Sequence, residues 1–216
     1  MFRLRPLVTE DISDWVDAAF DWFDDRFPAP PQPILPTPDF FMAPSGRDEA
    51  TARKILADVQ RLMGADQPLE IVPIRQLPAE WRVTVHDTAD VAGTFQQADG
   101  VSVISYDPEL MANPLAFINM VVHEVMHARL AGLDDDLPGG PKAVEPVTDL
   151  GCIIAGFGIF QLETADRLGW AGYLSQQTRA HALAVFLQRR GLGEEAIAGF
   201  LSSRCKKLLR RAARAL

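Results

Sequence analysis

A largely apolar segment at residues 113–130 constrains the fold more than any other part of the chain, because it has the spacing of a buried helix. Asn113 is a good N-cap, and Pro114 suits the first helical position because its missing N–H would be unpaired there anyway. Apolar residues then recur at helical intervals, namely Leu115, Ile118, Val121, Val122, Val125 and Met126. The sequence therefore predicts a helix over about 114–131 with one buried stripe.

The same segment contains His123-Glu124-Val125-Met126-His127, a His-Glu-x-x-His pattern at the border of the apolar stripe. Residues four apart on a helix lie on one face, so the two imidazoles can share one tetrahedral zinc ion. Glu124 can reach the same site as general base on a water molecule, without being a ligand. The alternative is a core helix whose histidines hydrogen-bond to a neighbour. Two histidines that bracket a glutamate favour one Zn²⁺ held by His123 and His127.

A catalytic zinc needs a third protein ligand, and the residues directly after the motif do not supply one. An extended motif of the metzincin kind would need Gly three positions after His127 and His or Asp six positions after it. Those positions hold Leu130 and Leu133, so the sequence excludes this class. The acidic run 134–136 is typical of an exposed loop.

Glu145 and Asp149 are again four residues apart, and Pro146 indicates that a helix begins near them. By themselves they also fit a solvated acidic helix start. Together with the motif they resemble the gluzincin arrangement of thermolysin-like zinc peptidases. This resemblance implies that Glu145 is the third ligand and that Asp149 holds the outer N–H of a zinc-binding histidine, His123. Asp149 is the alternative third ligand, since zinc accepts either carboxylate.

Three further segments resemble a broad group of uncharacterised bacterial proteins with a gluzincin-like core. They are 37–41, 147–150 with 156–158, and 172–175. The resemblance to this group does not indicate which substrate the protein acts on. An oxyanion-stabilising donor would come from the C-terminal half in such enzymes, and the candidates here are Tyr173, Arg179 and His181. A packing role is the alternative for His181, because its segment is otherwise apolar.

Strand-like segments precede the motif, at 69–75, 81–86, 91–96 and 101–106. Pro73 argues for an edge position, and Asp99-Gly100 is typical of a hairpin turn. This order is similar to the N-terminal half of zincin peptidases, where an edge strand pairs with substrate; 91–95 or 101–106 could fill that role. We therefore expect an α+β, zincin-like fold with a small mixed or antiparallel sheet (69–106), the motif helix and a helical C-terminal half (145–213).

The remaining segments suggest how the chain is organised. Residues 1–44 are predicted as a helix (9–26) and a Pro-rich strap whose Phe40-Phe41-Met42 packs on the body. Residues 45–216 are predicted as a single zincin-like domain. Within it we expect a helix at 45–63 with Ser45 as N-cap, and helices at about 145–165, 175–190 and 194–213.

Charge and composition restrict the classes of binding partner that we expect. The net charge of −8 argues against nucleic-acid binding, although six cations gather at the C-terminus: Arg204, Lys206, Lys207, Arg210, Arg211 and Arg214. We expect that helix to dock by its apolar side, with a partner or membrane surface as the alternative. We expect no signal peptide, no membrane span, no disulfide framework from the two cysteines, and a cytoplasmic location.

These patterns together predict a zinc-dependent hydrolase, a metallopeptidase that acts on a peptide or protein substrate. The alternative is a catalytically weak or inactive zincin-fold module with a structural or regulatory role. A latent form, with the cleft blocked by Phe40-Phe41 and the strap, belongs to the same alternative.

Overall fold

The computed structural model describes residues 6–43, 45–74, 93–98, 101–167 and 172–216. It is mostly helical and divides into two compact units. We call Pro36–Ala131 the sheet unit, and Met1–Leu35 with Gly132–Leu216 the helical unit. The predicted division at residue 44 stays a prediction.

The sheet unit contains a three-stranded mixed sheet with the strand order β1-β3-β2. Its strands are β1 (Leu69–Pro73), β2 (Gly93–Ala98) and β3 (Val101–Tyr106). β1 runs parallel to β3, while β2 is antiparallel to β3 and pairs Ala98 with Val101. The predicted mixed sheet, the antiparallel pairing of β2 with β3 and the edge position of Pro73 are confirmed, while the predicted turn at Asp99-Gly100 lies outside the described residues. The predicted strand 81–86 lies outside the described residues.

One expectation about the sheet is wrong. The strand 101–106 was a candidate for pairing with extended substrate, but β3 lies between β1 and β2. Its backbone hydrogen-bonding groups are therefore directed at neighbouring strands on both sides, so no substrate can be added there. The other candidate, 91–95, overlaps β2 at residues 93–95 and stays a prediction.

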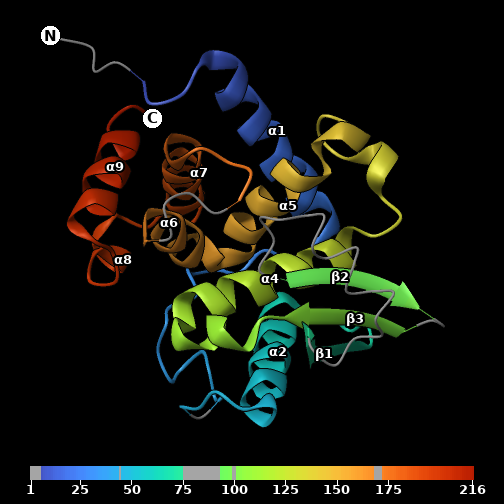
Figure 1. Ribbon diagram of the computed structural model, residues 1–216. Coiled ribbons are helices and arrows are strands. Elements are labelled where there is room, and N and C mark those ends of the chain that lie inside the picture. The colour runs from blue at the N-terminus through green and yellow to red at the C-terminus, as the bar shows by residue number, and fades with distance from the viewer. Residues whose placement is uncertain (1–5, 44, 75–92, 99–100, 168–171) are drawn as a thin grey trace, which may run out of the picture. The chain divides into compact units, whose positions relative to one another are not determined.

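Two long helices cover this sheet: α2 (Glu49–Met63) packs on β1 and on α4 (Pro114–Leu130), and α4 packs on β2 and β3 (Figure 1). A short 3-10 helix, η2 (Pro108–Ala112), precedes α4. The predicted N-cap of α2 is wrong: Asp48, not Ser45, accepts a hydrogen bond from the Thr51 N–H at 2.7 Å. A carboxylate three residues before a free N–H makes a good cap, so the helix begins at Glu49.

The helical unit begins with α1 (Glu10–Arg26), close to the predicted range. Two 3-10 turns (Asp134–Asp136 and Pro141–Ala143) precede α5 (Val144–Cys152). The predicted helix 145–165 is interrupted after α5 by a π-helical turn (Ile153–Phe157) and continues as α6 (Gly158–Arg167).

Gly156 explains this interruption. Its φ of 94° is strained for any residue with a side chain, and a Cβ there would lie 3.1 Å from both Pro30 and Ile34. The Ile34 N–H donates to the Gly156 carbonyl at 2.9 Å. The kink therefore provides the space and the acceptor that anchor the strap in this unit.

The C-terminal helices are α7 (Gln176–Arg189), capped by Ser175 as predicted, α8 (Glu195–Ala198) and α9 (Ser203–Ala213). The predicted single helix 194–213 is wrong, because the chain leaves the helix at Gly199 and restarts where the Ser202 hydroxyl accepts from the Cys205 N–H. α9 docks on α7 and α6 through Cys205, Leu209 and Ala212, as expected for an amphipathic surface helix (Figure 1). Cys152 and Cys205 are both buried, and neither forms a disulfide bond in the described part of the chain.

The expected packing of Phe40-Phe41-Met42 needs adjustment. The two phenylalanines are half-buried, but Met42 is 71% exposed, and its backbone N–H donates to the Asp58 carboxylate. The stretch Pro141–Arg167 is long and apolar enough to cross a membrane by length and composition alone. In its most apolar window 78% of the residues are buried, so the protein itself covers this stretch.

The Asp48 cap leads to a prediction on stability. Asp48→Ala should lower the urea midpoint of unfolding, because the Thr51 N–H loses its partner, whereas Ser45→Ala should leave the midpoint unchanged. Hydrogen bonds from Thr51 hold the pKa of Asp48 below its usual 3.8. The part of the difference between the wild-type protein and Asp48→Ala that depends on the carboxylate charge should therefore be complete above pH 3.8 and be lost as the pH falls through the lower pKa that Asp48 has in the folded protein. An equal effect of the two substitutions would contradict the assignment.

Candidate metal centre

The motif helix α4 forms as the sequence predicts. The Asn113 side chain accepts from the Ala116 N–H, and Pro114 occupies the first turn. The helix is buried on most sides, and Glu124 is only 3% exposed. His123 and His127 are half-buried, which agrees with their predicted place at the border of the apolar stripe. This border position lets both rings belong to the core and still meet a ligand.

The two imidazoles face each other through the same ring nitrogen. Nε2 of His127 lies 3.0 Å from Nε2 of His123, and the ring planes are inclined by 78°. A tetrahedral zinc bound at roughly 2.0–2.1 Å would hold two ligand nitrogens roughly 3.3 Å apart. The pair therefore has nearly the separation that a shared ion requires. A hydrogen bond between the rings would have a similar length. A third metal-ligating group is therefore needed to distinguish a metal site from a hydrogen-bonded pair of histidines.

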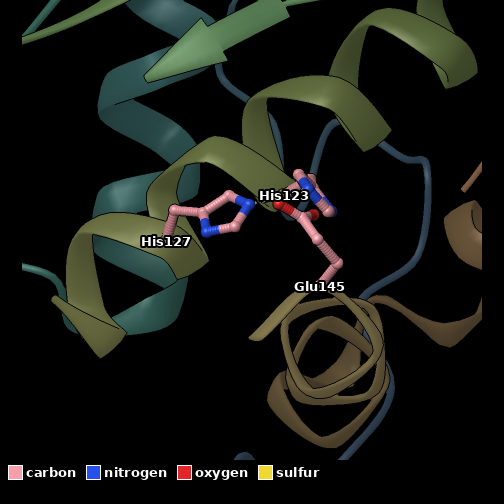
Figure 2. A group of neighbouring side chains, drawn as sticks. All are labelled: His123, His127 and Glu145. Atoms are coloured by element: carbon pink, nitrogen blue, oxygen red, sulfur yellow. Dashed lines mark hydrogen bonds between the residues drawn. The ribbon is translucent and has the colours of Figure 1, made fainter. Parts of the chain in front are cut away.

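Glu145 provides such a group. It lies in the first turn of α5, where Pro146 is accommodated without loss of a hydrogen bond. His123, His127 and Glu145 each offer a ligand atom within 4.8 Å of the others, so the group could hold a metal ion (Figure 2). All three are half-buried. Two imidazoles and a carboxylate form a donor set that suits zinc.

Asp149, one turn further along α5, has a different surrounding. Its Oδ2 accepts from the Arg179 guanidinium at 2.9 Å and from the backbone N–H groups of Tyr173 and Leu174 at 2.7 and 3.2 Å. Asp149 and Arg179 are 2% and 1% exposed. Burial lowers the pKa of Arg179, and the charge of Asp149 opposes that change. This buried ion pair was missed in the sequence, where the two residues are thirty positions apart.

The three candidates for an oxyanion donor lie in different surroundings. Arg179 donates to Asp149, to Gln161 Oε1 and to the Leu174 carbonyl. His181 is 5% exposed, its Nε2 lies 3.3 Å from the Ser13 hydroxyl, and burial lowers its pKa. This agrees with the packing role that was the alternative prediction for His181. The Tyr173 side chain is 53% exposed.

No protein-family model, curated protein or solved structure matches the chain.

A substitution at Gly172 tests how closely the loop at 172–174 packs against the Asp149–Arg179 pair. Its φ is 91°, and a Cβ would overlap the guanidinium of Arg179 and lie 2.7 Å from Asp149 Oδ2. Gly191 also has a positive φ, of 66°, but nothing lies within 4 Å of its Cβ position. Gly191→Ala should therefore show only the backbone cost, about 1 kcal/mol of unfolding free energy, while Gly172→Ala should lose clearly more. Equal losses in urea unfolding would show that the pair tolerates displacement.

Proposed function

We propose that the protein is a zinc-dependent hydrolase, a metallopeptidase of gluzincin-like type in a zincin-like fold. The observation that carries the proposal is the group formed by His123, His127 and Glu145, with the buried Glu124 beside the first histidine. The described residues offer three protein donors, which would leave a fourth position free in a tetrahedral site; such an open position distinguishes catalytic from structural zinc.

In this proposal His123, His127 and Glu145 would hold the ion, with Glu145 as the third ligand. A bound Zn²⁺ would supply a Lewis acid that activates water near neutral pH and polarises a carbonyl group. Imidazole and carboxylate donors favour zinc over magnesium or calcium, which prefer sites made of oxygen ligands alone.

Glu124 acts as the general base. It accepts a proton from the attacking water and delivers it to the leaving amine of the cleaved peptide bond. Its neighbour in the chain is a ligand, so the carboxylate is held near the reacting water by the rigid helix α4. Because this side chain is buried, its carboxylate has little contact with bulk solvent.

Asp149 positions a ligand. As the resemblance to the gluzincin arrangement implies, we assign the outer N–H of His123 to the carboxylate of Asp149. Such a bond selects the tautomer and increases the basicity of the ligand.

One observation favours the alternative of a catalytically weak or inactive module. Arg179 and His181, two of the three candidate oxyanion donors, are buried and already bonded within the helical unit. That leaves Tyr173 as the candidate whose side chain is accessible. A site with no such donor loses about two to three orders of magnitude in rate. In the main proposal, the hydrolase acts on a peptide or protein substrate, is located in the cytoplasm and has no nucleic-acid partner.

Metal binding tests the ligand set. The protein purified free of metal should take up about one equivalent of zinc, and His127→Ala should abolish stoichiometric uptake. Glu145→Ala should weaken the affinity at least about tenfold, while Glu109→Ala, which removes an exposed glutamate of η2, should not change it. Affinity is measured by competition with a chromogenic chelator. Unchanged affinity in Glu145→Ala would remove Glu145 from the ligand set.

Hydrolysis tests the general base. Glu124→Gln keeps the shape of the side chain but cannot accept the proton. It should therefore bind zinc as the wild-type protein does and cleave a fluorogenic peptide library about 10²-fold more slowly or worse. Full activity in this variant would refute the role of Glu124. Zinc binding without hydrolysis by the wild-type protein would favour the inactive module.

A further inference from the structure

A cavity of about 610 Å³ opens inside the sheet unit, apart from the residues of the proposed zinc site. The end of the Pro-rich strap, the start of α2, η2 and the first turns of α4 surround it. Its walls are mostly apolar and include Pro38, Phe41, Ile55, Leu115 and Ile118. The volume lies within the range of roughly 300–1,000 Å³ that is typical of sites for small organic ligands.

The cavity uses a different part of α4 from the histidines. With about 100° between successive residues, Ile118 lies roughly 140° around the helix axis from His123 and roughly 180° from His127. No member of the proposed ligand set lines the cavity. A ligand bound here would therefore be independent of the proposed hydrolase function.

Two polar groups in the wall indicate the chemistry of an occupant. Arg47 lines the cavity, is exposed, and forms no ion pair in the part of the chain that the structure describes. The Thr37 Oγ1 atom is buried in the same wall, and no described residue provides it with a hydrogen-bond partner. Because this oxygen is covered by protein atoms, Arg47 is the charged group of the wall that an occupant can reach.

We propose that this cavity binds a small anionic amphiphile, a carboxylic acid with an aliphatic or aromatic body. The carboxylate pairs with Arg47. The apolar body packs against Pro38, Phe41, Leu115 and Ile118. Charge complementarity selects this occupant over a neutral one, because Arg47 is the cation in a mostly apolar wall and forms no ion pair with any described residue.

The charge is tested by titrating the intact protein calorimetrically with decanoate and, separately, with decanamide at low ionic strength. Decanoate should bind about twofold to fivefold more tightly, the range expected of a partly exposed ion pair. Arg47→Gln should remove that difference. Arg53→Gln, which removes an exposed cation of α2 outside the cavity wall, should preserve it. Equal affinities for the two ligands in the wild-type protein, or an unchanged preference in Arg47→Gln, would overturn the proposal.

The location is tested by filling the cavity. Leu115→Trp, at a half-buried position, and Ala112→Trp, at an exposed one, each add an indole to the wall. Each variant that retains the circular dichroism spectrum of the wild-type protein should bind decanoate at least about tenfold more weakly. The exposed position of Ala112 makes that variant the safer one to fold. No binding of decanoate by the wild-type protein, or full binding in Ala112→Trp, would overturn the assignment of the ligand to this cavity.

Discussion

The buried ion pair between Asp149 and Arg179 is the interaction on which the helical unit depends most. Two charges taken out of water are tolerated only when each is fully paired, and removal of one partner typically costs about 3–5 kcal/mol. Here Asp149 Oδ2 accepts from the guanidinium and from two backbone N–H groups, while Arg179 also donates to Gln161 and Leu174. This network joins α5, α6, α7 and the loop at Gly172, and so it orients the helix that carries Glu145.

The helix α4 has a comparable role in the sheet unit. Its apolar side chains pack against α2, β2 and β3, and this burial holds the backbone of the motif still. The histidines are half-buried at the edge of that contact, with their Nε2 atoms 3.0 Å apart. The first turns of the same helix line the cavity with Arg47 and Thr37. One rigid element thus presents two chemically different surfaces without large movements of its own.

Local signals predicted the elements whose residues depend on their neighbours in the chain. Asn113-Pro114 marked the start of α4, Ser175 marked the start of α7, and the alternation around Asp99-Gly100 predicted the hairpin of β2 and β3. The errors occurred where a nearby residue offered a better cap or a distant contact decided. Asp48 replaced Ser45 as cap, and Gly156 adopted a positive φ because Pro30 and Ile34 occupy the space beside it.

The sequence by itself determined the His-Glu-x-x-His spacing, because an α-helix places residues four apart on one face whatever surrounds it. It also nominated Glu145, which the structure groups with the two histidines. Only the tertiary structure decided that Arg179 neutralises Asp149, that β3 is a central strand, and that the strap and α4 enclose a cavity. These depend on side chains far apart in the chain, whose approach is governed by packing and charge rather than by local periodicity.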